Sequence, residues 1–371
     1  MTWFEQTFGF REQEYGLTQR RCRMQGERLL IDTDPPRTFQ VGRLELPSLG
    51  ELRQRVSGLA DFPSPLLAPI TTRDCSDDAT EGVDQGIMPG FRSGPPGLAV
   101  CNILADAHAL HTRPEVHGAL IQVASQFNLL EMPGPSVTPE DGITAYAHDH
   151  TQGPACALAC APATLFRNYL VRVDANSDAI GQTRLRQINA LRDLEQALGL
   201  PGLRMQNGYA MADAPWVRSA AQRLQSMGEA ELDGLRQCLR IGWQQDTQVT
   251  ATGAPAGQRV SQVFCSALPV AYNRASSFDW APLACLVLQA SYEATLLAAV
   301  LNAQATGNPR VYLTAVGGGA FGNQREWIVQ AMRRALLTVR HWPLQVHIVN
   351  YQAIHPAFQA LQDEWTPTPG C

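Results

Sequence analysis

The sequence predicts an α/β protein built as three layers, α/β/α, around a mixed and largely parallel sheet. The first observation is that apolar runs of strand length alternate with helical periodicity through the last third of the chain. The second is the composition, because 45% hydrophobic and 17% charged residues in a chain of 371 are enough for a sizeable core. Alternating strands and helices typically form a parallel sheet with helices on both faces.

The last third of the chain shows the alternation most clearly. Strands are expected at 262–271, 311–316 and 344–349, where apolar residues run together. Helices are expected at 282–304 and 326–339, where apolar residues recur at helical spacing. These five elements predict consecutive strand–helix–strand units.

The middle of the chain supplies further strands and one helix. Apolar runs predict strands at 98–104 and 119–127, followed by a loop rich in Gly, Pro, Asp and His. A helix is expected at 154–170, because a proline in the first turn is favourable there. Pro162 lies inside that stretch and predicts a break or kink.

The composition changes along the chain and predicts two parts. Residues 1–97 are interpreted as an N-terminal accessory region, and residues 98–371 as the α/β domain. Within that domain, the more polar stretch 174–260 is interpreted as a helical insertion. It contains helix candidates at 182–198 and 215–240.

The accessory region itself shows short elements. Strands are expected at 28–31 and 38–41, on either side of a turn-like Asp-Pro-Pro. Ser48 is expected to cap a helix, with Glu51 three residues later completing a capping box. Residues 61–97 are rich in Pro, Gly and Asp and are expected to form a loop.

Composition also excludes several classes of function. All 29 basic residues are arginine, which excludes Schiff-base lysine chemistry and a P-loop lysine. The net charge of −5 gives no indication of a nucleic-acid partner. No run of about 18 apolar residues and no signal peptide is found, so we expect no membrane association. Nine scattered cysteines, an odd number, favour reduced thiols and a cytoplasmic location.

The most informative motif is a glycine-rich run between a predicted strand and a predicted helix. It reads Gly317-Gly318-Gly319-Ala320-Phe321-Gly322-Asn323. Glycines let backbone N–H groups approach a ligand, and the helix N-terminus behind them favours an anion such as a phosphate. The run lacks the lysine of a Walker motif and comes too late in the chain for a Rossmann fingerprint. The alternative is a tight turn without a ligand.

Carboxylates and histidines gather in the loop at 140–153. Cleavage of a glycosidic bond builds positive charge at the anomeric carbon, which a carboxylate stabilises or relieves by activating water. We therefore predict catalytic roles for Asp141 and Asp149 first, and for Glu131 third. The alternative is that Asp149 caps the following helix and that Asp141 is an ordinary loop residue.

Histidine and aromatic side chains in the two motifs have other possible roles. His148 and His150 flank Asp149, but no cluster of Cys or His elsewhere would complete a metal site, so neither a metal nor a cofactor is expected. Solvent-facing histidines are the preferred interpretation. Phe321 and Tyr146 are candidates for stacking on a ribose, although Tyr146 is equally well explained by packing.

These motifs resemble those of macrodomains. The strand 311–316 with the Gly-Ala-Phe-Gly-Asn core that follows resembles the second phosphate loop of that family. The run from Gln122 to Asn128 resembles its first ligand strand, which usually ends in asparagine. The usual Gly-Gly-Gly of the first loop is missing, and Thr151-Gln152-Gly153 stands at the helix start instead. This departure resembles the divergent branch of poly(ADP-ribose) glycohydrolases and effector-type arginine ADP-ribosyl hydrolases.

The resemblance implies a macrodomain-like fold over about 98–350, which binds ADP-ribose or an ADP-ribosylated protein. It implies hydrolysis of the bond between ADP-ribose and a protein side chain, with arginine favoured. An ADP-ribose reader without catalysis, or an enzyme acting on another nucleotide, remains an alternative. The residues expected to contact the ligand are Gln122, Asn128, Thr151, Gln152, Gly153, Gly317, Gly318, Gly319, Ala320, Phe321, Gly322 and Asn323.

Overall fold

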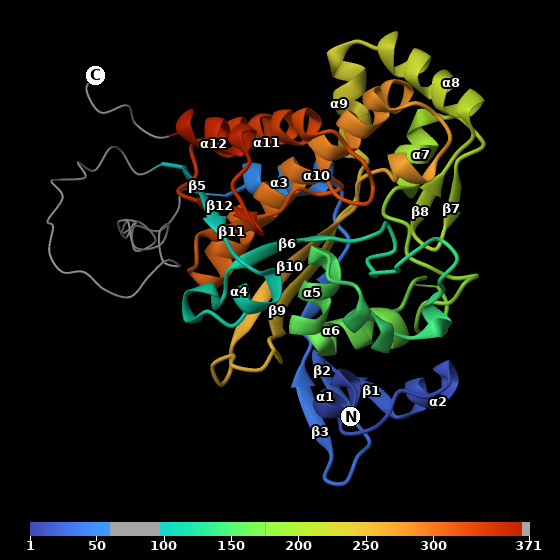
Figure 1. The fold of residues 1–371 in the computed structure, drawn as a ribbon, viewed down its shortest axis with the longest axis vertical. Coiled ribbons are helices and arrows are strands. Elements are labelled where there is room, and N and C mark those ends of the chain that lie inside the picture. The colour runs from blue at the N-terminus through green and yellow to red at the C-terminus, as the bar shows by residue number, and fades with distance from the viewer. Residues whose placement is uncertain (60–96, 175, 366–371) are drawn as a thin grey trace, which may run out of the picture.

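A seven-stranded mixed sheet organises the protein in a computed structural model that describes residues 1–59, 97–174 and 176–365 (Figure 1). Five neighbouring strands are parallel, and two antiparallel strands extend the sheet at one edge. The α/β prediction with a mixed, largely parallel sheet is therefore confirmed. The strands in sheet order are β4 (Arg43–Glu45), β9 (Gly242–Gln248), β10 (Arg259–Cys265), β6 (Leu120–Ala124), β11 (Arg310–Leu313), β12 (Gln345–Asn350) and β5 (Ala99–Leu104).

Helices cover both faces of this sheet, which gives the three layers (Figure 1). One layer is arranged around the long helix α10 (Ser277–Thr306) and contains α3 (Leu49–Ser57), α8 (Ala214–Gln225), α9 (Glu229–Gln237), α11 (Arg325–Val339) and α12 (Pro356–Asp363). The other layer contains α4 (Ala107–Leu110), α5 (Gln152–Ala159) and α6 (Ala161–Leu165). Successive side chains of β6 pack against the two layers in turn, with Leu120 toward α10 and Ile121 toward α5.

Helix α10 is apolar on almost every side because it lies inside its layer, between the sheet and other helices. It begins after Ser276, whose side chain accepts a hydrogen bond from the Asp279 N–H, and it ends at Gly307 in the left-handed conformation. By length and composition it is the one described helix that could cross a membrane, but 89% of its apolar stretch is buried within the protein.

The N-terminal residues pack on the α5 and α6 layer rather than forming a separate unit. Their elements are α1 (Trp3–Phe8), α2 (Tyr15–Arg20) and the small antiparallel sheet of β1 (Cys22–Gln25), β2 (Arg28–Ile31) and β3 (Arg37–Gln40). Phe4, Phe8 and Ile31 share one apolar cluster with Leu165 and Tyr169. Strand β4 and the capped helix α3 belong to the main sheet and its helical layer. Since these two elements precede residue 97, the predicted domain boundary there is corrected. The loop expected at 61–97 lies, except for residue 97, outside the described residues.

The stretch 174–260 is only partly helical, which corrects the predicted insertion. Its elements before β9 are α7 (Arg192–Leu198), the hairpin of β7 (Arg204–Gln206) and β8 (Tyr209–Met211), and then α8 and α9. Of the helix expected at 182–198, only the last part forms, as α7. The stretch 215–240 contains two helices, α8 and α9, instead of one. Strand β9 escaped prediction because it is polar; the Gln244 side chain is buried and donates to the Val41 carbonyl at 2.9 Å.

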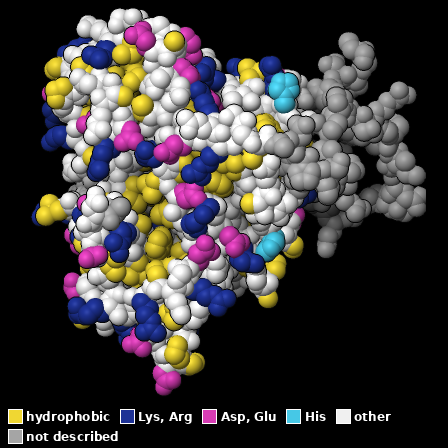
Figure 2. Space-filling model, turned by 180° about the vertical axis from the view of Figure 1, so that it is seen from behind, with side chains coloured by type: hydrophobic (Ala, Val, Ile, Leu, Met, Phe, Trp, Pro, Cys, Tyr) yellow, Lys and Arg dark blue, Asp and Glu magenta, His cyan; other side chains and the backbone are white. Residues whose placement is uncertain are grey.

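The helix expected at 154–170 is divided into three parts. Helix α5 ends before Cys160, α6 carries Pro162 in its first turn, and a wider π-helical turn, η6 (Phe166–Leu170), follows. Short 3₁₀ turns complete the described chain: η3 (Pro114–Val116), η4 (Pro139–Asp141), η5 (Thr144–His148) and η7 (Val270–Tyr272). On the face opposite to that of Figure 1, arginine and acidic side chains are interspersed, with apolar areas between them (Figure 2).

Candidate functional site

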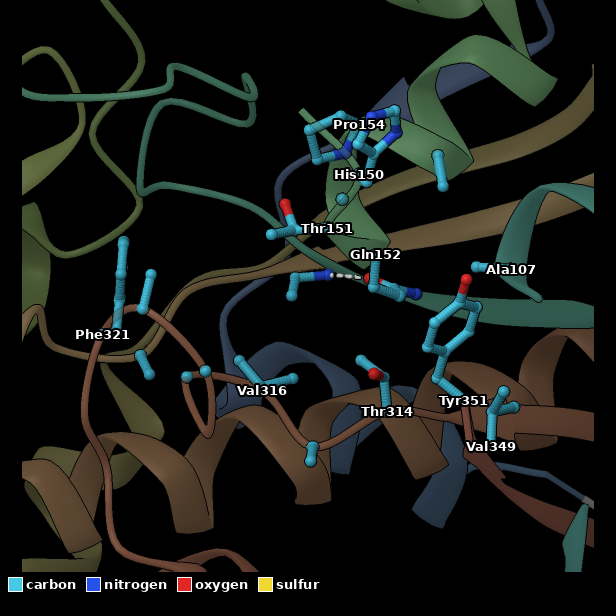
Figure 3. A pocket seen from close by; sticks show the side chains of 18 of the residues that line it. Ala107, His150, Thr151, Gln152, Pro154, Thr314, Val316, Phe321, Val349 and Tyr351 are labelled. Carbon is cyan, nitrogen blue, oxygen red and sulfur yellow. Dashed lines mark hydrogen bonds between the residues drawn. The ribbon is translucent and has the colours of Figure 1, made fainter. Parts of the chain in front are cut away.

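A cavity of about 750 Å³ opens at the carboxyl ends of four parallel strands. The residues that directly follow β5, β6, β11 and β12 line it, namely Ala105, Ser125, Thr314 and Tyr351. Ligands of open α/β sheets bind at this edge, and a volume of this size suits a nucleotide-sized molecule. Figure 3 shows Thr151 and Gln152 facing Thr314 and Val316 across it.

The glycine run forms one wall. Gly317 has φ +74°, and a Cβ there would lie 2.3 Å from the Ala267 Cβ, so only glycine is compatible with this position. The buried Asn323 donates from Nδ2 to the Leu268 carbonyl at 2.9 Å and fixes the end of the loop. Gly317, Gly319, Ala320 and Phe321 line the cavity, whereas Gly318, Gly322 and Asn323 do not.

The exposed part of this loop offers hydrogen-bond donors to a ligand. Within the part of the chain that the structure describes, the N–H groups of Gly319, Ala320 and Phe321 donate to no protein acceptor. A Cβ at Gly319 would have no atom within 4 Å, so the space in front of it is open. Free N–H groups beside a helix N-terminus, here that of the 15-residue helix α11, are an arrangement that favours anions in proteins.

The opposite wall is the N-terminus of α5. Gln152 ties this helix to β6, because its Oε1 accepts from the Ala124 N–H at 2.9 Å and its Nε2 donates to the Gln122 carbonyl at 2.8 Å. Asp149 lines the cavity and accepts from both the N–H and the hydroxyl of Thr151, at 2.9 and 2.7 Å. Asp149 therefore fixes Thr151, the residue just before α5, and faces the cavity at once, but it accepts from no N–H of the first helical turn.

Glu131 is the buried carboxyl of the cavity. Its side chain is 2% exposed, it lines the cavity, and its Oε1 has no hydrogen-bond partner. The carboxyl lies against Gly153 at the start of α5, where a Cβ would come within 2.2 Å of Glu131 Oε2. Burial, and to a smaller extent the charge of Asp149, raises the pKa of Glu131 well above 4.5, and Arg167 opposes this.

The cation behind Glu131 is itself buried. Arg167 comes from the π-helical turn, donates from Nε to the Leu129 carbonyl at 3.0 Å, and stacks 3.8 Å from the centre of the Phe264 ring. Burial lowers the pKa of Arg167 to about 10, so the guanidinium stays charged at neutral pH. It moderates the raised pKa of Glu131 without removing it.

The loop that carries Glu131 is held on both sides. The Gln126 side-chain amide forms two hydrogen bonds with the backbone of Met132: it accepts from the N–H at 2.7 Å and donates to the carbonyl at 3.2 Å. The Tyr209 hydroxyl donates to the same carbonyl at 2.7 Å. The Glu131 N–H donates to the Tyr146 hydroxyl at 3.1 Å. The carboxyl is thus presented by a fixed backbone, as a preorganised catalytic group requires.

Besides Gly318, Gly322 and Asn323, three further predicted site residues lie outside the cavity. Asp141 does not line the cavity, because its Oδ2 accepts from the N–H and hydroxyl of Thr138 at 2.8 and 3.0 Å. Asn128 is buried under the loop and accepts from the Leu130 N–H at 3.1 Å. Gln122 points toward α10 and donates to the Thr295 hydroxyl at 3.0 Å. These side chains stabilise the fold around the cavity, which corrects their assignment as ligand or catalytic contacts.

The cavity also contains residues that the sequence did not reveal. Tyr209 and Tyr272 join Phe321 in an aromatic cluster with ring centres 5.2 to 5.7 Å apart. Tyr351 lies at the other end of the cavity from Phe321 (Figure 3), and Arg325 lines it from the start of α11. Tyr209 and Tyr272 carried no local signal, since only the fold brings β8 and η7 beside the glycine loop. His150 lines the cavity and His148 does not.

The raised pKa of Glu131 predicts how stability changes with pH. Unfolded, this carboxyl ionises near 4.5, while in the fold it stays protonated to a higher pH. Its burial therefore costs stability progressively as pH rises from about 4.5 through the folded pKa. Glu131→Gln should raise the melting temperature relative to wild type at pH 8, and the difference should shrink toward pH 4.5. The exposed Asp141→Asn is the control, and a pH-independent difference for Glu131→Gln would contradict the assignment.

The fold and the cavity together describe an α/β protein with a ligand pocket at the carboxyl edge of its sheet. No protein-family model matches the sequence, and no curated protein matches it. Solved structures of poly(ADP-ribose) glycohydrolases are similar to the chain. The Thermomonospora curvata enzyme bound to the inhibitor ADP-HPD is 12% identical with a TM-score of 0.42, over 94% of this chain and 95% of that one.

Two further structures show the same level of likeness. Another structure of the Thermomonospora curvata enzyme is 13% identical with a TM-score of 0.40, over 95% of this chain and 96% of that one. A mutant of the Deinococcus radiodurans enzyme in complex with ADP-ribose is 12% identical with a TM-score of 0.39, over 86% of this chain and 90% of that one. In all three comparisons at most 13% of the residues are identical.

Proposed function

We propose that the protein binds ADP-ribose and hydrolyses the glycosidic bond that joins it to a protein side chain. The observation that carries this proposal is Glu131, a buried carboxyl with an unpartnered oxygen, in a cavity whose facing wall is a glycine loop with free N–H groups. Buried polar atoms in native proteins nearly always have partners. An exception inside a nucleotide-sized cavity indicates a group kept for a substrate.

The cavity has three parts that match the three parts of ADP-ribose. At one end the half-exposed Ile354 and the exposed Tyr351 offer an apolar surface for the base. In the middle, the glycine loop and the α5 N-terminus face each other across the space for the diphosphate. At the other end, the aromatic cluster around Phe321 lies beside Glu131, because Tyr209 belongs to that cluster and its hydroxyl bonds the neighbouring Met132.

The two carboxyls at the ribose end divide the chemistry. Glu131, protonated because of its raised pKa, gives its proton to the leaving nitrogen or oxygen as the bond to the anomeric carbon breaks. Asp149 stabilises the positive charge on that carbon and accepts a proton from the attacking water. Water supplies the new hydroxyl, and the proton taken up by Asp149 returns to Glu131 through solvent, so the net reaction is hydrolysis.

Arginine is the linkage that we favour within this proposal. The departure at Thr151-Gln152-Gly153, which resembles the branch that includes arginine ADP-ribosyl hydrolases, supports it, and so does the chemistry of the leaving group. A cationic guanidinium becomes a neutral, strongly basic guanidine when its bond to the anomeric carbon breaks, and a buried protonated carboxyl supplies the proton that this base takes up. The half-exposed carboxylate of Asp149 would attract a cationic guanidinium at the same end of the cavity.

The proposal is tested by binding and release together. Calorimetry should show ADP-ribose binding at least about tenfold more tightly than ADP or a UDP-sugar, since neither of these would occupy all three parts, whereas NAD contains all three groups. Release of ADP-ribose should be measured from arginine-, serine- and glutamate-linked proteins and from polymer, with release from arginine fastest. Binding without release from any of them would identify a reader instead, and failure of ADP-ribose to bind would refute both.

A further inference from the structure

Glu12 connects the N-terminal segment to the loop beside the cavity. It lies between α1 and α2, and its half-buried carboxylate accepts three hydrogen bonds. Oε1 accepts from the Ile143 N–H at 2.8 Å and the Tyr169 hydroxyl at 2.7 Å, and Oε2 accepts from the Thr144 N–H at 2.7 Å. A carboxylate that accepts two consecutive backbone N–H groups holds that backbone in one conformation.

The loop is shaped to receive this carboxylate. Gly142 has φ +82°, and a Cβ there would lie within 2.8 to 2.9 Å of the Glu12 carboxyl atoms. Trp3 in α1 contacts the same loop, because its Nε1 donates to the Thr144 carbonyl at 2.8 Å. The N-terminal segment therefore contacts the loop through both a charged and an aromatic side chain.

The loop carries the contact onward to the cavity. Two residues after Thr144, the buried Tyr146 places its hydroxyl 3.1 Å from the Glu131 N–H that donates to it. Thr144, which Glu12 contacts, and Tyr146 belong to the same short 3₁₀ helix, η5. A shift of the loop would therefore move the support of the Glu131 backbone.

We propose that Glu12 is a positioning residue for the reaction, which fixes the 142–146 loop so that Tyr146 holds Glu131 in place at the cavity. This inference rests on the proposed function for its catalytic consequence, and it assigns a role to the N-terminal segment. That segment does not line the cavity, and its proposed effect on Glu131 passes through the 142–146 loop.

The environment of Glu131 supplies a readout that a general loss of stability would not move. The titratable or charged groups that act on Glu131 or respond to it are Arg167 from the π-helical turn, Asp149 before α5, Tyr146 in η5, Cys156 in α5 and Tyr209 in β8. Of these, only Tyr146 is positioned through Glu12 by the contacts described above. If the loop loosens and water enters, the burial that raises the Glu131 pKa decreases, and its pKa should fall.

The test is Glu12→Gln, with Glu14→Ala as the matched control. All three partners of Glu12 are donors, so an amide nitrogen cannot replace a carboxylate oxygen toward both N–H groups. Glu14 also lies in the N-terminal segment, but it only caps α2. In Glu12→Gln, kcat should fall about tenfold or more with KM changed less than about threefold, and the alkaline limb of the pH–rate profile should move to lower pH. Glu14→Ala should change neither.

A second measurement keeps this inference separate from the proposed function. The melting temperature should be measured against pH for four proteins: wild type, Glu131→Gln, Glu12→Gln and the double variant. In each background, the difference that Glu131→Gln makes reports the pKa of Glu131 without any substrate. A midpoint that moves to lower pH in the Glu12→Gln background supports positioning even if no linkage is hydrolysed. An unchanged midpoint with unchanged hydrogen exchange at Ile143 and Thr144 would overturn the inference, whatever the activity.

Discussion

Replacing Glu131 by glutamine should lower the rate of ADP-ribose release about 10³-fold, while affinity for ADP-ribose changes less than about threefold. Glutamine preserves the size of the side chain and its place against Gly153 at the start of α5. It cannot give up a proton to the leaving group, which is the role assigned to the buried carboxyl. Single-turnover release from an arginine-linked substrate and calorimetry with ADP-ribose measure the two quantities separately.

Two carboxylates of the neighbouring loop serve as controls for this result. Asp141→Asn should leave release within about twofold of wild type, because its carboxylate is bonded to Thr138 outside the cavity. Asp149→Ala should slow release strongly while binding survives, since Asp149 faces the cavity. Rapid release by Glu131→Gln together with loss of release in Asp141→Asn would reverse the assignment of the two residues.

The order in which the sequence ranks Asp141, Asp149 and Glu131 as catalytic candidates depends on local composition and not on burial. Asp141 and Asp149 ranked above Glu131 because they lie in a loop rich in acidic residues and histidines, which is visible in one dimension. The property that distinguishes Glu131 is burial against Gly153 with an unpartnered oxygen, and this depends on the packing of α5 against the loop after β6. Spacing along the chain contains no information about that packing.

The glycine loop was predictable because its requirement is local. Gly317 has a positive φ in the short connection between β11 and α11, which is a local requirement for glycine, and the tertiary contact with Ala267 adds to it. The alternation of strands and helices in the last third was predictable for the same reason, since periodicity is a local signal. The α/β class followed from these local signals.

The rest of the fold depends on contacts between distant segments. Strand β9 is polar in sequence, yet it joins the main sheet because β4 and β10 pair with it on either side. The sequence predicts an accessory region at the N-terminus, whereas Glu12 and Trp3 contact the loop at 142–144 across more than a hundred residues. Such pairings are set by the tertiary structure and override local propensity.

Replacing Gly319 by glutamate should weaken ADP-ribose binding at least about 100-fold without changing the melting temperature by more than about 2 °C. A Cβ at Gly319 has no atom within 4 Å, so the fold accommodates the side chain. The added carboxylate would stand beside the free N–H groups of Ala320 and Phe321, where the diphosphate is proposed to lie. It would both occupy that space and repel the phosphates. Calorimetry and thermal unfolding measure the two effects.

The same substitution on an outer helix distinguishes local repulsion from a change in net charge. Gly234 lies exposed in α9, again with no atom within 4 Å of a Cβ, and Gly234→Glu should leave ADP-ribose affinity unchanged. If Gly319→Glu binds ADP-ribose as tightly as Gly234→Glu, the glycine loop does not hold the diphosphate. Its glycines would then serve only the tight turn that Gly317 requires. Loss of binding in Gly319→Glu alone, with both proteins equally stable, assigns the loop to the ligand and leaves catalysis to Glu131.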